Sequence, residues 1–355
     1  MMVKKPSVIF VICLFFIFAS VWLYTLLIPV VSQRDGIIFY LKPGTSESTL
    51  IADLSKLGMI RSPFLFTLYT RLQPTSYLKT GEYYFPEGSS AVSIWRQVTQ
   101  GRGFFQRAFT IIPGWSFKQV QQALLQAEGL EHELINMDNK EIMRRLGYLK
   151  LNPEGEFYPE TYYYTRGYSD FVILKRANVL MQKKLNQAWK QRASGLPYQD
   201  IYQMLIVASL IEKETHVEAE RPMIAGVIIN RLKKNMLLQI DPTVIYGMGE
   251  HYQGKITKKD LIQDTPYNTY VHKGLPPTPI AMPSMSSIQA ALHPIQHQYY
   301  YFVALGKQGH QFSETLIAHQ AAVAAANRQP GYFNERLIEN YLYSLFQMTT
   351  LTKVH

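Results

Sequence analysis

Cysteine is almost absent from this chain of 355 residues. Its one cysteine, Cys13, lies inside an apolar run near the N-terminus. The rest of the chain therefore has no internal disulfide, thiolate zinc site or cysteine nucleophile. The sequence also lacks a dense tract of lysine and arginine, although its net charge is +10; its basic clusters are pairs such as Lys183-Lys184. We read this charge as favouring an anionic membrane surface or acidic polymer over nucleic acid.

The sequence signatures of several enzyme classes are missing as well. His132-Glu133 begins an H-E-x-x-H zinc motif, but position 136 is Asn. The sequence contains no Gly-x-Ser-x-Gly motif, Walker loop or Rossmann fingerprint. The nine histidines are scattered without ligand spacing, so we expect neither a metal nor a cofactor. The chemistry that remains is that of carboxylates and amides, which suits the cleavage of glycosidic bonds.

A long uncharged segment near the N-terminus predicts a membrane anchor. It runs from Val8 to Val31, directly after Lys4 and Lys5. About 20 apolar residues suffice to cross a bilayer. No A-x-A-like cleavage site follows, so we predict a retained helix, with a cleaved signal as the minor alternative. By the positive-inside rule, the protein is expected to be a single-pass inner (cytoplasmic) membrane protein whose body lies in the periplasm.

A short repeat predicts a small α/β module after this anchor. Both copies, at residues 39–57 and 109–130, read as a strand, a Pro-Gly turn and a helix that begins with serine. Residues 81–86 alternate like a further strand. We expect a small α+β module over roughly residues 36–110, with a helix at 49–57, that closes with a strand at 107–112.

The remainder of the body predicts a mainly helical domain with short strands. Residues 118–195 are mostly helical, but an aromatic and acidic segment with two prolines interrupts them at 153–162. That segment is either a sugar-contacting wall or an ordinary packed loop. The predicted fold class is therefore α+β. Further elements are expected at residues 93–100, 200–215, 221–235 and 286–293 (helices) and 299–305 (strand).

One of these helices carries the acid of greatest interest. From Asp200 to Thr215 the sequence is strongly apolar, and Leu205, Ala208 and Glu212 fall on one stripe at helical spacing. An acid at the end of an apolar stripe is costly unless it is paired or functional. Glu214 lies at the edge of the neighbouring stripe. The pattern alone leaves both acids open, and it also allows both to lie in an exposed last turn.

Several long motifs carry a resemblance to a known family. Residues 205–225 read LIVASLIEKETHVEAERPMIA, and further motifs follow in order: VIINRL (227–232), LLQIDPTVIYGMG (237–249), PYNTY (266–270), GLPPTPIAMPS (274–284) and FVALGKQGHQFSETLIAH (302–319). This text resembles the MltG (YceG-like) family of endolytic murein transglycosylases. The match covers nearly the whole chain and includes the anchor, the Pro-Gly-x-Ser module, which is LysM-like in the family, and residues 154–162.

The resemblance implies a lyase that cuts between N-acetylmuramic acid and N-acetylglucosamine within a peptidoglycan strand. The muramic acid C6 hydroxyl attacks its own C1 and leaves a 1,6-anhydro end. The family's catalytic glutamate is the first acid of Glu-Lys-Glu-Thr, which is Glu212 here; Glu214 is the reserve candidate. Glu212 would protonate the departing oxygen and then accept the hydroxyl proton. Because the nucleophile is intramolecular, no second carboxylate has to activate water.

Other polar residues in the matched motifs are candidates for binding the substrate or orienting Glu212. Amides and hydroxyls could hold the acetamido groups and stabilise an oxocarbenium-like state. The alternative for each is a loop brace or helix cap. Glu154 and Tyr162 are secondary candidates, and Thr278 departs from the family, where glycine is common. The substrate-binding candidates are Gln239, Asp241, Tyr267, Asn268 and Thr269.

These expectations define the domains and the competing functions. The rivals are a two-carboxylate muramidase with Asp241 as second acid, and a non-catalytic peptidoglycan-binding scaffold. Peptidoglycan strands and the membrane are the expected partners, and nucleic acid is not. With the anchor, the resemblance implies a role in ending nascent glycan strands beside penicillin-binding proteins. The sequence leaves strand-length preference, oligomeric state and glycan binding by the module open. The predicted domains are a cytoplasmic tail (1–7), a transmembrane helix (8–31), a LysM-like module (32–110), a catalytic domain (111–345) and a C-terminal tail (346–355).

Overall fold

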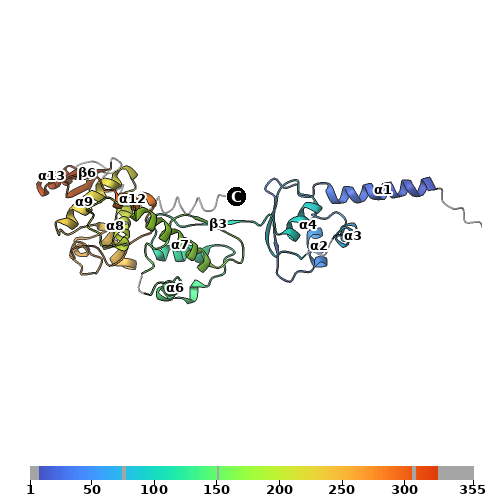
Figure 1. The fold of residues 1–355 in the computed structure, drawn as a ribbon, viewed down its shortest axis with the longest axis horizontal. Helices are drawn as coiled ribbons and strands as arrows, with labels where there is room; N and C mark the ends of the chain where they lie inside the picture. Colours follow the sequence, from blue (N-terminus) through green and yellow to red (C-terminus); the bar gives the residue numbers. More distant parts are fainter. Residues whose placement is uncertain (1–7, 74–76, 150–151, 306–308, 327–355) are drawn as a thin grey trace, which may run out of the picture. The chain divides into compact units, whose positions relative to one another are not determined.

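A computed structural model describes residues 8–73, 77–149, 152–305 and 309–326 (Figure 1). The chain divides into two compact units. The first comprises Met1–Arg107 with Tyr163–Tyr168, and the second Ala108–Tyr162 with Ser169–His355. The predicted tails, 1–7 and 346–355, lie outside the described residues. The predicted domain boundary after residue 110 stays a prediction.

The first unit begins with a long apolar helix, α1 (Val8–Leu27). Among the described residues, α1 is the one helix long and apolar enough to cross a membrane, which is compatible with the predicted anchor. The helix ends before Pro29, because a proline disfavours helical backbone at the residue that precedes it. The end of α1 is not separate from the rest of the unit: Leu26 is buried in the unit's core, and Trp22 packs against it.

The rest of the first unit is a small α/β module. Strands β1 and β2 pair antiparallel, with Ile37 opposite Phe85. Each helix begins at a serine that accepts a backbone N–H, and the sequence pattern predicted this for the first of them, α2. The strands and the helices α2 and α4 lie where they were expected, α3 was not predicted, and the likeness to a LysM domain stays a prediction. The elements are β1 (Ile37–Leu41), α2 (Glu47–Lys56), α3 (Pro63–Arg71), β2 (Gly81–Phe85) and α4 (Ala91–Gln100).

One detail of the predicted module is wrong. The strand expected at 107–112 exists as β3 (Arg107–Thr110), but it pairs with β4 (Thr161–Tyr164) instead of closing the β1–β2 sheet. The physical reason is that the edge of β2 is already occupied. The Tyr84 N–H donates to Gly103 O, and the Phe105 N–H donates to Glu82 O. The backbone groups at this edge of β2 are therefore paired by residues 103–105, a few residues before the strand that the repeat predicted at 107–112.

The second unit is mainly helical, as predicted, and is built around α8 (Ile201–Glu214). All residues from Met204 to Glu212 are buried, so α8 is a central core helix and not a helix with one apolar stripe. The other elements are α5 (Phe117–Gln126), η1 (Leu134–Asn136), α6 (Asn139–Arg145), α7 (Asp170–Trp189), η2 (Glu218–Glu220), α9 (Arg221–Lys233), α10 (Asp241–Met248), η3 (Gly249–His251), α11 (Lys258–Leu261), α12 (Met285–Leu292), β5 (Tyr301–Ala304), β6 (His310–Ser313) and α13 (Leu316–Ala326).

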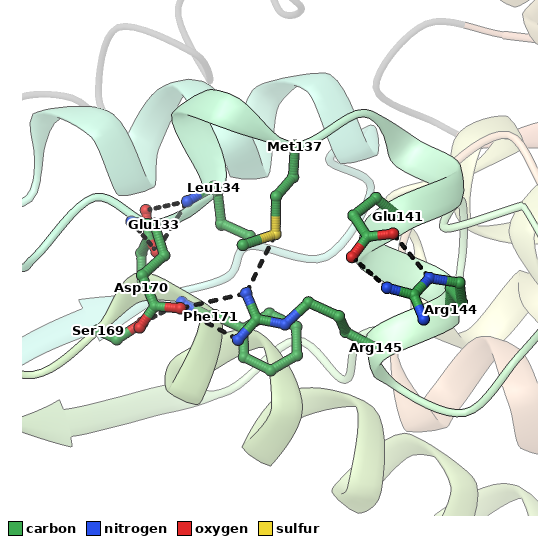
Figure 2. A network of polar contacts seen from close by, with 9 residues as sticks. All are labelled: Glu133, Leu134, Met137, Glu141, Arg144, Arg145, Ser169, Asp170 and Phe171. Atoms are coloured by element: carbon green, nitrogen blue, oxygen red, sulfur yellow. Dashed lines mark hydrogen bonds and ion pairs between the residues drawn. The ribbon is translucent and has the colours of Figure 1, made fainter.

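A polar network fastens the segment around α6 to the start of α7 (Figure 2). The buried Asp170 carboxylate accepts the N–H groups of Glu133 and Leu134 at 3.0 and 3.3 Å. Arg145 donates to Glu133 and lies 4.1 Å from the centre of the Phe171 ring. Burial raises the pKa of Asp170, while these N–H donors oppose that rise. The network is a structural brace, because each of its polar groups has a partner within the protein.

Candidate active site

Glu212 lies near the C-terminal end of α8, and only 6% of its surface is exposed. Its Oε2 accepts two hydrogen bonds from Ser284, one from the N–H at 2.9 Å and one from the hydroxyl at 2.6 Å. Ser284 is the N-cap of α12, so its N–H and hydroxyl are fixed at the start of that helix. The carboxylate is thus held in one orientation by a rigid element.

The second partner of Glu212 is an arginine. The Arg221 guanidinium donates to Glu212 Oε1 at 3.2 Å and to the Ser284 hydroxyl at 2.7 Å. Arg221 is the first residue of α9 and is 5% exposed. Glu212, Ser284 and Arg221 therefore form a closed triangle of polar contacts from three helices. A buried carboxylate requires such compensation, because an unpaired buried charge is costly.

Two loops flank this triangle. The Gly114 N–H donates to Met282 O at 2.8 Å, and the Met282 N–H donates to Trp115 O at 2.7 Å. The Pro-Gly-x-Ser loop and the loop before Ser284 are therefore joined. A methyl group added at Gly114 would meet Glu212 Cγ at 3.9 Å, which places this loop directly beside the acid. Trp115 is partly exposed there.

Glu154 is a second buried acid, with 3% of its surface exposed. Its carboxylate accepts the Phe117 N–H at 2.9 Å, at the start of α5, and the Tyr246 hydroxyl at 2.9 Å, from α10. Burial raises the pKa of Glu154 to about 7, although these two donors favour the ionised form. The predicted secondary candidate is therefore a carboxyl group that titrates near neutral pH and links three segments of the unit.

Tyr246, which donates a hydrogen bond to Glu154, also contacts the ring of Tyr267. The rings of Tyr246 and Tyr267 lie 4.8 Å apart between their centres. The Tyr267 hydroxyl lies 2.9 Å from the Thr278 hydroxyl. Thr278 thus provides a polar partner for a predicted substrate-binding residue.

The remaining predicted binding residues come together in a separate hydrogen-bonded group. The Gln239 N–H donates to Thr269 O at 3.0 Å, and the neighbouring Ile240 N–H donates to the Thr269 hydroxyl at 3.0 Å. Asp241 accepts the Tyr270 hydroxyl. Asn268 is buried, and its amide donates to three backbone carbonyls, those of residues 260, 261 and 263.

These contacts separate bracing residues from accessible ones. Asn268 and Thr269 are 1% and 2% exposed and use their polar atoms within the protein, which matches the loop-brace alternative. Gln239 is exposed and has a positive φ of 53°, a backbone conformation that few non-glycine residues adopt. Of this group, Gln239 is the exposed side chain, and its Oε1 accepts a hydrogen bond from Arg231 at 3.4 Å.

Comparison with known proteins adds to this geometry. The model of the YceG-like family matches residues 39–325. The chain belongs to the YceG-like family. One relative is the endolytic murein transglycosylase of Bacillus subtilis (strain 168). It is 31% identical to this chain over 300 residues, which cover 79% of this chain and 81% of the relative. The endolytic murein transglycosylase of Streptococcus pneumoniae serotype 2 is 24% identical over 74% of this chain, which spans about half (53%) of that relative.

A solved structure from the same family is also similar. The crystal structure of a putative yceG-like protein from Listeria monocytogenes matches with a TM-score of 0.51 and 28% sequence identity. The match covers 82% of this chain and all of the other. The fold of this YceG-like chain is thus shared with an experimentally observed protein.

The two remaining candidates, Glu214 and Tyr162, have partners outside the triangle. Glu214 is half-buried and interacts electrostatically with Arg231 and Tyr270. It therefore belongs with the Asp241 group. Tyr162 is 3% exposed, and its hydroxyl donates to Tyr158 O at 2.6 Å, which makes it a core residue. Over the described part of the chain, no group of three or more His, Cys, Asp or Glu side chains is arranged to hold a metal.

Sequence reasoning missed the two partners of Glu212. Arg221 and Ser284 both lie inside the quoted motifs, in ERPMIA and AMPS. A serine before a predicted helix is an N-cap signal, which could have identified Ser284 as a fixed donor. Nothing in the local sequence pattern pairs either residue with Glu212, because Arg221 follows it by 9 positions and Ser284 by 72.

Proposed function

We propose that this YceG-like chain is an endolytic murein transglycosylase. It cleaves the N-acetylmuramic acid–N-acetylglucosamine bond within a peptidoglycan strand and leaves a 1,6-anhydro end. The observation that carries the proposal is the buried triangle of Glu212, Ser284 and Arg221, in a chain whose relatives bear this name. A single acid held by fixed donors suits a reaction that needs one proton shuttle and no activated water.

In the first step, the protonated Glu212 carboxyl gives its proton to the glycosidic oxygen. The C1–O bond breaks with its electron pair going to that oxygen, and positive charge develops on C1 and the ring oxygen. In the second step, Glu212 accepts the proton of the C6 hydroxyl while this oxygen bonds to C1. Arg221 and the Ser284 donors stabilise the negative charge that Glu212 carries between the two steps.

The surrounding residues receive supporting roles in this proposal. Trp115, partly exposed on the loop beside Glu212, packs on a sugar face. Gln239, Asp241 and Tyr267 contact polar groups of the glycan, while Asn268 and Thr269 hold the segment that carries them. Glu154 positions α10 through Tyr246. The module of the first unit is LysM-like and assists in holding the strand.

The location follows from the anchor. Helix α1 crosses the inner membrane once, with its N-terminus in the cytoplasm, because Lys4 and Lys5 precede it. The body lies in the periplasm near newly made strands, where it terminates their elongation beside penicillin-binding proteins. Co-purification with a wall synthase would support this last point, and its failure would count against it.

Product analysis tests the proposed reaction. The full chain in detergent is incubated with peptidoglycan, and the fragments are identified by mass spectrometry. The expected products are fragments that end in 1,6-anhydromuramic acid and come from cleavage inside the strand. Reducing ends would instead indicate hydrolysis, with Asp241 as the first candidate for a second acid. Binding without cleavage would favour the scaffold.

A further inference from the structure

Helix α1 is too short both to span a bilayer and to leave the first unit clear of the membrane. A helix rises 1.5 Å per residue, and the hydrocarbon core of a bilayer is about 30 Å thick. All 20 residues of α1 are therefore needed to span it. Yet the last turns of α1 are occupied by protein contacts. The Trp22 indole donates to Leu65 O of α3 at 3.0 Å, and Leu26 is buried in the unit's core.

The part of α1 that is clear of these contacts is too short to span the membrane. Every side chain from Ile9 to Phe18 is exposed, and the stretch from Ile9 to Val21 measures about 20 Å. If α1 spans the bilayer, the level of Trp22 lies inside the outer part of the membrane. Helix α3, which contacts α1 at this level (Figure 1), must then lie at the same depth.

The surface of α3 fits that environment. Phe64 and Leu68 of α3 and its C-cap residue Leu72 follow one another at a spacing of four residues and form an apolar stripe. They are 77%, 37% and 65% exposed, whereas Phe66 on the other face is buried. No charged residue occurs between Arg61 and Arg71. An exposed stripe of this kind on a short amphipathic helix is typical of segments that lie in the membrane interface.

Basic side chains mark the level at which the hydrocarbon would end. Arg61 donates to the Tyr24 hydroxyl and to Pro29 O, just beyond the end of α1. A cleft of about 340 Å³ beside Leu27 is lined by Arg96 and Arg102 of the same unit. Guanidinium groups at this depth can bind lipid phosphates, and tyrosine and tryptophan favour the same layer.

We propose that the first unit is embedded in the outer-leaflet interface of the membrane through the α3 stripe, Phe64, Leu68 and Leu72. The occupant of this stripe is the phospholipid bilayer, since α3 packs against the helix that enters it. The inference rests on the proposed membrane anchor. It implies that the module is held at the membrane surface and does not swing freely on a tether.

Depth-dependent fluorescence quenching tests this proposal in the full chain. Cys13 is the only cysteine and lies in α1, so an environment-sensitive label on it reports the anchor itself. In a Cys13→Ala background, Phe64→Cys and Leu72→Cys place the label on the stripe. Ile38→Cys, at an apolar residue of β1 that is 49% exposed, is the matched control in the same unit. Labelled proteins are reconstituted into phosphatidylethanolamine–phosphatidylglycerol vesicles that contain spin-labelled lipids.

Strong quenching at positions 13, 64 and 72, with a loss of fluorescence several-fold greater than at position 38, is expected. If the label at position 13 were quenched, but those at positions 64 and 72 no more than the one at position 38, the inference would be overturned and the anchor would stand. Absence of quenching at 13 would overturn the anchor and the inference with it. The label at position 64 could instead show the emission of an apolar environment without quenching by the spin-labelled lipids. If this effect grew with protein density in the vesicles, the stripe would be covered by a second copy of the chain, and the proposal would be contradicted.

Discussion

Glu212 has three donors around one buried carboxylate, and two of them belong to Ser284. The hydroxyl of this serine also accepts from Arg221, so it couples the two charged partners. A hydrogen bond to a charged group contributes about 1.5–3 kcal/mol. Much of the site's ability to hold negative charge on Glu212 is therefore expected to depend on this one oxygen.

We expect Ser284→Ala to lower kcat by about tenfold or more with little change in KM, because the lost donor stabilises the charged acid between the two steps. Ser284→Thr, which retains the hydroxyl, should recover most of the rate. Ser46→Ala is the control. Ser46 is also a helix N-cap, but of α2 in the first unit, so this variant loses about 1 kcal/mol of stability without loss of kcat. Equal activity of Ser284→Ala and wild type would contradict the assignment.

Glu154 gives the protein a pH-dependent stability. Its folded-state pKa of about 7 lies above the ordinary value of 4.5, so between these values the folded protein keeps a proton that the unfolded chain loses. Stability is therefore expected to fall as pH rises from about 4.5 to 7, and to change no further above 7 on this account.

Glu154→Gln removes that titration. Relative to wild type, the free energy of unfolding of the variant should rise by about 2.5 kcal/mol between pH 5 and pH 8, since its buried group no longer ionises. Urea unfolding in detergent, followed by tryptophan fluorescence at both pH values, measures the difference. A difference between variant and wild type that is the same at pH 5 and pH 8 would rule out Glu154 as the cause.

At the scale of elements, the periodicity of the sequence predicted much of the fold. The apolar run at 200–215 predicted α8, and the Pro-Gly-x-Ser start predicted α2, because apolar runs and caps are local properties. Helix α3 was not predicted. The pairing of β3 was not predictable, since an edge filled by residues 103–105 is a long-range outcome. For the same reason, the sequence indicated Glu212 but not its partners Arg221 and Ser284.

The glycine of the Glu154-Gly155 motif shows how closely two loops of the second unit meet. Gly155 has a φ of +81°, and a methyl group there would lie 2.6 Å from Pro279 Cβ. Gly195 has a similar φ of +75° with open space around it. Gly195→Ala is expected to cost about 1 kcal/mol from backbone strain alone.

Gly155→Ala should cost roughly 2 kcal/mol more than Gly195→Ala, since it adds a steric clash to the same strain. It should also lower activity, because Pro279 lies on the segment that leads to Ser284. Thermal unfolding and product formation of the two variants, measured side by side, provide the comparison. Equal losses of stability would mean that the loops separate without cost.

At the scale of the whole molecule, the anchor is also part of a folded unit. Leu26 is 6% exposed within the core of the first unit, whereas Leu23 on the same helix is 57% exposed. Leu26→Ala is expected to destabilise this unit by about 2–4 kcal/mol, and Leu23→Ala to have little effect. Thermal unfolding in nanodiscs tests the pair. If both variants unfold like wild type, α1 is only a tether.

The central claim is that Glu212 alone carries the proton in both steps. Its most direct test is the rate at which 1,6-anhydromuramic ends form on peptidoglycan with wild type, Glu212→Gln and Glu214→Gln. The two variants make the same change two residues apart on α8. The account predicts that Glu212→Gln forms no such ends and that Glu214→Gln retains most of the wild-type rate. Anhydro ends formed by Glu212→Gln, or their loss in Glu214→Gln alone, would contradict it.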